Sequence, residues 1–197
     1  MMKPTRGLTL PELLVALAVV AILIAVAAPS FRGLIEVQRL RGINSQLVTD
    51  LQFARNEAAA QGVPLRVVFR YSPTETCYSL FTSTTALFNG NAARCNCLQG
   101  AGSACTPGNG TTEVRTVSIP GTLGVKVEPI DLVDAVAFDP ATGGLLKIPI
   151  DHSSAPMPEF RVQAALDPSR KLLNVLNQSG RPAVCSPFGT SLGEVPC

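Results

Sequence analysis

A single acidic side chain interrupts an apolar stretch near the N-terminus. Glu12 follows a basic segment that contains Lys3 and Arg6, and every residue from Leu13 to Ala28 is apolar. A carboxylate at membrane depth costs on the order of a few kcal/mol unless it finds a partner, so it is a functional candidate by default. Glu12 therefore offers pairing with a positive charge. The alternative is a carboxylate near the membrane surface that reaches water.

The six cysteines offer a second kind of chemistry. All of them follow the apolar segment: Cys77, Cys95, Cys97, Cys105, Cys185 and Cys197. An even number of cysteines in a non-cytoplasmic domain indicates disulfides, and six allow fifteen pairings. A four-cysteine zinc site is the alternative. Both the Cys-x-Cys spacing and an oxidising compartment disfavour zinc.

Residues with the types of a catalytic centre lack its spacing. Asp151, His152 and Ser153 are adjacent, whereas a hydrolytic triad needs groups that converge from separate elements. His152 is the only histidine, and we expect it in an exposed loop. Three aspartates lie close together without the spacing of a metal loop: Asp131, Asp134 and Asp139. We therefore expect no enzyme and no cofactor.

Length and composition indicate one domain behind an apolar segment. The chain has 197 residues, of which 46% are apolar and only 15% are charged, where about a quarter is usual. The formal net charge is +2. Without residues 1–7, basic and acidic residues are equal in number. The rest of the chain thus lacks the broad positive field that non-specific nucleic-acid binding uses.

The apolar segment is long enough to predict a membrane helix over residues 8–29. A bilayer needs about 20 such residues, and the basic residues before them are expected to stay cytoplasmic, which places the rest of the chain outside. Two alternatives are a secretory signal cut after Ala25-Val26-Ala27 and an uncleaved anchor. The length of the run and Glu12 argue against the secretory signal.

The arrangement resembles the type IV prepilin signal, in which a short basic leader ends in Gly and the fifth mature residue is Glu. Here the leader would be residues 1–7, ending at Gly7, and Glu12 would be the fifth mature residue. The resemblance implies that a prepilin peptidase cuts after Gly7 and methylates Leu8. It also implies that Glu12 pairs with the Leu8 ammonium of a neighbouring subunit, strongly so in apolar surroundings. Pro29 lies where pilins usually carry a helix-kinking proline.

Residues 30–62 predict an amphipathic helix that continues the apolar one. The apolar positions recur at intervals of three, four and seven: Leu34, Val37, Leu40, Leu47, Leu51, Ala54 and Ala58. Gly62 and Pro64 are expected to end the helix. We expect the apolar stripe to pack on the domain formed by residues 63–197.

The run from Leu51 to Ala58, Leu-Gln-Phe-Ala-Arg-Asn-Glu-Ala, resembles the FimT/FimU and GspH family of minor pilins and pseudopilins. We expect Arg55 and Glu57 of this run to be solvated helix charges. The resemblance implies an α+β, type IV pilin-like fold, in which a long N-terminal helix packs on an antiparallel β-sheet domain. The sequence pattern predicts strands at 65–71, 77–82, 113–119, 125–127, 135–138, 159–165, 172–177 and 182–185, and a long loop over 88–112.

The resemblance also bears on two details. It implies a Cys185–Cys197 disulfide, because pilins commonly close a C-terminal loop in this way, and we expect Cys77–Cys95 and Cys97–Cys105 for the other four. Some FimT-like pilins bind DNA through a Gly-Arg-x-Arg motif before this loop. Only its first half is present, in Gly180-Arg181-Pro182-Ala183. The candidate DNA contacts are Arg181, Lys171 and Arg170.

Together these features predict a minor pilin in the tip or priming complex of a type IV pilus. The alternatives are a minor pseudopilin of a type II secretion system and a DNA-binding competence pilin. The expected partners are other pilin subunits, the prepilin peptidase and the inner membrane. The expected location is a single pass through that membrane with the domain in the periplasm, and outside the cell once the subunit joins the fibre.

Overall fold

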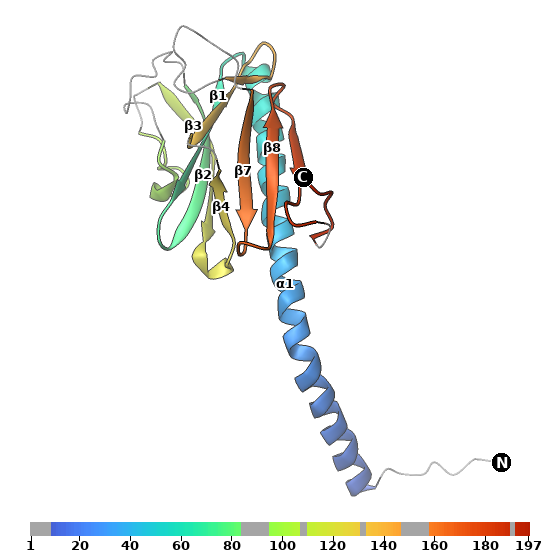
Figure 1. Ribbon diagram of the computed structural model, residues 1–197. Coiled ribbons are helices and arrows are strands. Elements are labelled where there is room, and N and C mark those ends of the chain that lie inside the picture. The colour runs from blue at the N-terminus through green and yellow to red at the C-terminus, as the bar shows by residue number, and fades with distance from the viewer. Residues whose placement is uncertain (1–8, 84–94, 107–109, 131–132, 147–157, 190–191) are drawn as a thin grey trace, which may run out of the picture. The chain divides into compact units, whose positions relative to one another are not determined.

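The computed structural model describes residues 9–83, 95–106, 110–130, 133–146, 158–189 and 192–197, apart from the side chains of residues 26–30. The chain forms two compact units, residues 1–38 and residues 39–197 (Figure 1). The helix α1, Leu10–Gln61, contributes to both. It ends where Gly62 takes a φ of +67°, a left-handed conformation that costs glycine little and stops a helix.

The C-terminal part of α1 presents the predicted apolar stripe to the domain core. Its buried residues recur at intervals of three, four and seven: Leu40, Leu47, Leu51, Ala54 and Ala58. Leu34, which the pattern placed on the same stripe, belongs to the other unit and is 54% exposed. The stripe that packs inside this chain therefore begins at Leu40.

The domain is built of antiparallel β-sheet, as expected, and contains two such sheets. The first has five strands in the order β3-β2-β1-β5-β6: Thr111–Pro120, Glu75–Ser83, Leu65–Tyr71, Ala135–Phe138 and Leu145–Leu146. The second has four in the order β4-β7-β8-β9: Lys126–Pro129, Glu159–Ala165, Lys171–Asn177 and Pro182–Cys185.

The chain passes from the first sheet to the second through a short turn. Proline has no N–H for the ladder, so β3 ends at Pro120. A single 3₁₀ turn, Gly121–Leu123, then leads to β4. A Cβ on Gly121 would lie 2.8 Å from the Thr74 carbonyl oxygen. This close approach brings the turn against the β1–β2 connection.

Aromatic side chains join the two sheets. The ring of Phe69 in β1 lies 5.8 Å from that of Tyr78 in β2 and 5.9 Å from that of Phe160 in β7. Strands β7 and β8 alternate buried and more exposed residues, the pattern of strands covered on one face. The two strands of the first sheet that precede β3 are buried almost throughout.

A disulfide-bonded segment covers the far face of the first sheet and accounts for that burial. Val68, Phe81 and Ala135 of this sheet cluster with Cys95 and Cys105. The segment 95–106 includes the 3₁₀ turn η1, Cys97–Gln99. Among the strands that the structure describes, only β6 has no counterpart in the prediction, because its two residues are too few to show an alternating pattern.

Candidate assembly site

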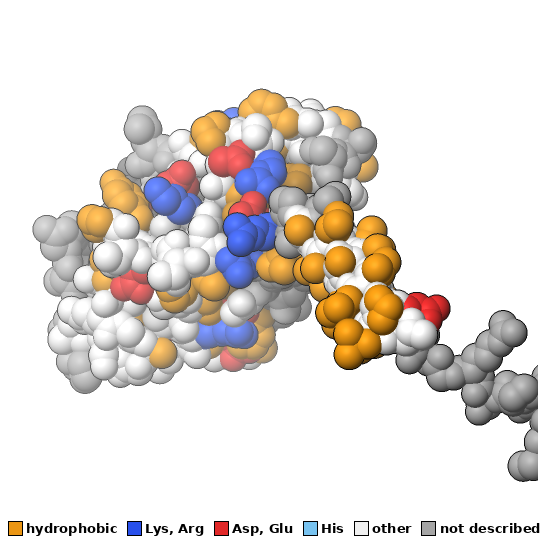
Figure 2. All heavy atoms as spheres, turned by 90° about the horizontal axis from the view of Figure 1, so that it is seen from below, with side chains coloured by type: hydrophobic (Ala, Val, Ile, Leu, Met, Phe, Trp, Pro, Cys, Tyr) orange, Lys and Arg blue, Asp and Glu red, His pale blue; other side chains and the backbone are white. Residues whose placement is uncertain are grey.

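The N-terminal unit carries an unbroken apolar helix surface. Every large apolar side chain between Leu10 and Ile24 is at least 50% exposed: Leu10, Leu13, Leu14, Val15, Leu17, Val19, Val20, Ile22, Leu23 and Ile24. Figure 2 shows hydrophobic side chains over the side of this stretch that is in view. A helix that is apolar on all sides needs a protein or lipid partner. This surface is therefore the first part of the candidate site.

Glu12 lies in the first turn of that helix and caps it. Its Oε2 accepts from the Thr9 backbone N–H at 3.4 Å and from the Thr9 hydroxyl at 3.5 Å. The Thr9 carbonyl oxygen in turn accepts from the amides of Glu12 and Leu13, each at 3.1 Å. Thr9-x-x-Glu12 has the sequence of a capping box, and the structure forms the half in which the glutamate accepts from the N–H of the first residue. Its signature stands in the sequence, but the capping role of Glu12 was not predicted.

Three other predicted site residues are not described at the side-chain level. Gly7 and Leu8, the predicted cleavage and methylation positions, lie outside the described residues. Pro29 lies within α1, in the stretch 26–30 whose side chains are also outside the description, so its kink stays a prediction. Among the helices that the structure describes, none meets the length and apolarity required to cross a membrane.

Arg55 connects α1 to both sheets, contrary to our expectation of a solvated charge. Its Nε donates to the Gly143 carbonyl oxygen at 3.2 Å and to the Ser179 carbonyl oxygen at 3.1 Å. Gly143 belongs to the turn between β5 and β6, and Ser179 to the turn between β8 and β9. The family-typical arginine therefore holds α1 to the two turns, and nothing in the sequence pattern indicated these distant partners.

Two glycines allow these turns to meet. Gly143 has a φ of +68° and Gly180 a φ of +75°. A Cβ on Gly180 would lie 2.2 Å from the Gly143 carbonyl oxygen, closer than atoms can approach. The glycine of the half motif Gly180-Arg181 therefore has a packing reason to be glycine. Its presence does not by itself indicate DNA binding.

A buried charged group also fixes α1 against the first sheet. Asp50 accepts from the Tyr78 hydroxyl at 2.7 Å and pairs with Arg115 of β3 at 2.9 Å. Its side chain is 2% exposed. Burial and the hydrogen bond to Asp50 raise the pKa of Tyr78 well above its usual value. The only sign of this group in the sequence is that a polar residue, Asp50, stands among the regularly spaced apolar residues of α1.

The three candidate DNA contacts do not form one patch. Arg170 and Lys171 stand at the start of β8, whereas Arg181 follows its end, a seven-residue strand away. Arg170 donates to Asp167 at 2.7 Å, and the Lys171 ammonium lies 5.4 Å from the centre of the Phe188 ring. The length of β8 thus separates Arg181 from the other two, and DNA contact by these residues stays a prediction.

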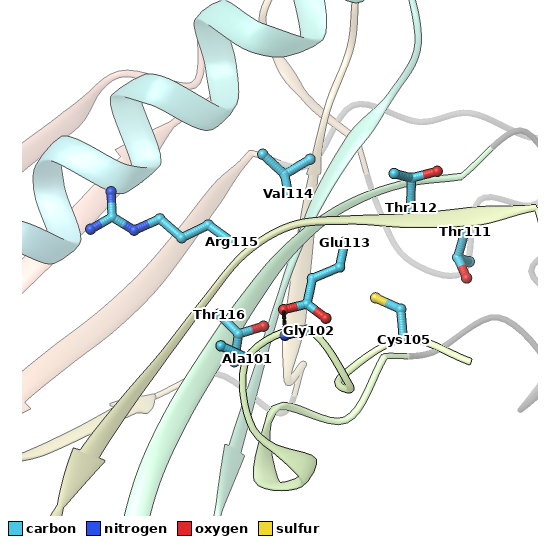
Figure 3. A pocket seen from close by; sticks show the side chains of 9 residues that line it. All are labelled: Ala101, Gly102, Cys105, Thr111, Thr112, Glu113, Val114, Arg115 and Thr116. Atoms are coloured by element: carbon cyan, nitrogen blue, oxygen red, sulfur yellow. Dashed lines mark hydrogen bonds between the residues drawn. The ribbon is translucent and has the colours of Figure 1, made fainter. Parts of the chain in front are cut away.

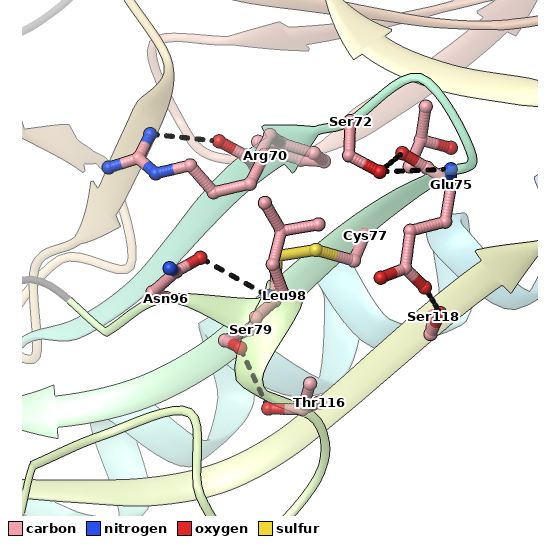
Figure 4. The surroundings of a disulfide bond; sticks show 12 residues. Arg70, Ser72, Glu75, Cys77, Ser79, Asn96, Leu98, Thr116 and Ser118 are labelled. Carbon is pink, nitrogen blue, oxygen red and sulfur yellow. Dashed lines mark hydrogen bonds between the residues drawn. A yellow bond between two sulfur atoms is a disulfide. The ribbon is translucent and has the colours of Figure 1, made fainter.

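All six cysteines form disulfides, so none is available for the zinc alternative. Cys185 pairs with Cys197, as the resemblance implied. The other pairs are Cys77–Cys97 and Cys95–Cys105, and both expected pairings of these four were wrong. The turn η1 begins at Cys97, and the disulfide joins it to Cys77 of β2, the cysteine labelled in Figure 4. The Asn96 N–H donates to the Ala104 carbonyl oxygen and brings Cys95 opposite Cys105.

Glu113 holds this disulfide segment against β3. A bulge between Leu80 and Phe81 in the pairing of β2 with β3 places Glu113 opposite Phe81, on the face that the segment covers. Its carboxylate accepts from the Gly102 and Ala104 amides at 2.8 and 3.0 Å. Glu113 and Gly102 are among the residues that line an open groove of ≈ 600 Å³ (Figure 3). Partial burial acts to raise the pKa of Glu113, but the hydrogen bonds outweigh it and the pKa is lowered.

Comparison with known proteins gives three findings. The profile of the family described as type II transport protein GspH matches residues 44–180, and that of the prokaryotic N-terminal methylation motif matches residues 2–28. No curated protein sequence matches significantly. The crystal structure of the type IV minor pilin FimU of Pseudomonas aeruginosa (strain PAO1) matches at 15% identity with a TM-score of 0.47, over 75% of this chain and 88% of that one.

Proposed function

Because the chain belongs to the GspH family of minor pilins and pseudopilins, we propose that it is a minor pilin in the tip or priming complex of a type IV pilus. The N-terminal methylation motif over residues 2–28 implies membrane anchoring and a prepilin peptidase as processing partner. The observation that carries the proposal is the uncovered apolar helix with Glu12 in its first turn. Such a surface suits a subunit that passes from the membrane into a fibre.

In this mechanism Glu12 has two tasks. Within its own chain the carboxylate caps α1 through Thr9. During assembly it pairs with the methylated ammonium of Leu8 on a neighbouring subunit. In apolar surroundings an unpaired charge is costly, so the pairing favours docking. Capping needs only an acceptor oxygen, whereas pairing needs the negative charge.

Two variants of Glu12 separate these tasks in the native host. Glu12→Gln keeps an acceptor for Thr9 and removes the charge, while Glu12→Ala removes both. We expect both variants to reach the membrane and both to be depleted from sheared fibres. Normal incorporation of Glu12→Gln would contradict the pairing role. Mass spectrometry of the wild-type N-terminal peptide should find N-methylated Leu8, and a chain that begins near Ala28 would contradict the proposal.

A type II secretion pseudopilin is the second candidate, because the matching family profile carries that description. Deletion of the gene distinguishes the two. Loss of surface pili with intact protein secretion supports the pilus role, and the reverse supports the pseudopilin. A competence pilin is favoured less, because Arg181 stands apart from Arg170 and Lys171. Retardation of DNA by the full chain, lost in Arg181→Ala, would restore it.

A further inference from the structure

One edge of the first sheet is formed by the longest strand that the structure describes. This strand is β3, which has ten residues and, among the described parts of the chain, pairs only with β2. The other edge strands, β4, β6 and β9, have only two to four residues each. Short edge strands are one way in which proteins avoid pairing with other chains. The length of β3, with its β-branched threonines and valines, favours such pairing instead.

A hydrogen bond at the end of β3 shows which of its backbone groups point outwards. The Gly121 N–H donates to the Thr74 carbonyl oxygen at 2.7 Å, so the backbone groups of these two residues face each other. In an antiparallel ladder, such pairs alternate with pairs whose N–H and C=O groups point away from the partner strand. By the register with β2, Thr116 and Ser118 belong to the second kind. Pro120, which has no N–H, stands at a position of the same kind.

The charged side chains of β3 do not guard this edge. Arg115 pairs with buried Asp50, and Glu113 accepts from the Gly102 and Ala104 amides. Figure 3 shows the two side chains leaving β3 in different directions. Charges on an edge strand usually discourage a second chain from pairing there. In β3 both charges are held by other parts of the same chain.

The open groove of ≈ 600 Å³ lies beside this strand (Figure 3). Residues 111–116 of β3 line it, together with Ala101, Gly102 and Cys105 of the disulfide segment. Six residues of a strand extend over about 20 Å, enough to pair with a short added strand. The Gly102 and Ala104 amides that bond to Glu113 are neutral, so they leave its negative charge unbalanced. The groove therefore favours an extended segment with a basic side chain.

We infer that β3 binds an extended segment of a different protein as an added strand of the first sheet, with a lysine or arginine of that segment at Glu113. The outward N–H and C=O groups bind the backbone, and the carboxylate selects the side chain. A second copy of β3 fits less well, because its Arg115 is bonded to Asp50. The inference goes beyond the proposed function and does not depend on whether the chain serves a pilus or a secretion system.

Photocrosslinking in the native host tests the partner with the full chain. A photoreactive residue replaces exposed Thr112 in the groove and, in the control, exposed Gln178 between β8 and β9. We expect Thr112 to label one segment of another protein, with a lysine or arginine within two positions of the labelled residue as mapped by mass spectrometry. Gln178 should not label that segment. No protein adduct at Thr112, an adduct without such a basic residue, or one with a second copy of this chain would overturn the inference.

Two substitutions test the contact itself. Thr116→Pro removes an N–H that points away from β2, a change that an edge strand tolerates. Glu113→Gln keeps the size of the side chain and removes its charge. We expect each to lower the yield of the Thr112 adduct at least about threefold. Glu159→Gln, the same change at an exposed position of β7, should match wild type.

Thermal unfolding of the purified variants in detergent shows whether each one folds. An undiminished adduct yield in folded Thr116→Pro would overturn the added strand. If Thr116→Pro does not fold, Glu113→Gln decides: a reduced yield supports the inference, and a yield equal to that of wild type overturns it.

Discussion

In α1, the large apolar side chains from Leu10 to Ile24 are all at least half exposed, whereas Leu40 and Leu47 are completely buried. The acidic residues differ in the same way: Glu12 is exposed in the first turn, while buried Asp50 has two donors. The C-terminal part of the helix finds its partners in its own chain. The N-terminal part has an equally apolar surface and must find them elsewhere. Apolarity alone therefore does not identify the core, and the position of the sheets does.

The largest effect should come from truncating the buried stripe. Leu51→Ala should lower the free energy of unfolding by about 2–5 kcal/mol, because it removes packed methyl groups and leaves a cavity. Leu17→Ala, which shortens a side chain that is 58% exposed, should leave the unfolding of the domain unchanged. Denaturant unfolding of both variants in detergent measures the difference. If both variants lost the same free energy of unfolding, the two parts of α1 would not differ in what they contribute to the stability of the domain.

A smaller effect is expected from removing the side chain of Arg55. Arg55→Ala removes the donor that bonds to Gly143 and Ser179 and should destabilise the domain by about 1–3 kcal/mol. Arg32, exposed in the N-terminal unit, provides the matched control. Thermal unfolding of Arg55→Ala and Arg32→Ala should therefore separate. If Arg55→Ala unfolds like wild type, its bonds to the turns add no net stability.

The smallest effect should depend on pH. It concerns the stability that Glu113, in β3 of the first sheet, contributes. The pKa of Glu113 is lower in the folded protein than the ordinary value of 4.5, so its contribution to stability is present above that value and is lost as the pH falls through the folded pKa. Glu113→Gln should thus be less stable than wild type at pH 7, and the gap should narrow towards pH 3. A gap that stays constant with pH would exclude the charge of Glu113 as its cause.

The local elements could be predicted from the sequence alone. Intervals of three and four predicted the buried residues Leu47, Leu51, Ala54 and Ala58, and the strand pattern predicted β7 with the bounds that the structure gives it. These patterns depend on neighbours within a few positions, so they can be read from a linear chain. The apolar run with Glu12 could also be recognised in the sequence, and the match to the methylation motif covers the same residues.

The three-dimensional packing determines which distant groups meet. It divided the strands between two sheets, paired Cys77 with Cys97, and brought Arg55 to Gly143 and Ser179 across 88 and 124 positions of the chain. It also separated Arg181 from Arg170 by the length of β8. Each outcome depends on how loops close between elements. Many closures have nearly equal entropy, so packing in three dimensions selects among them.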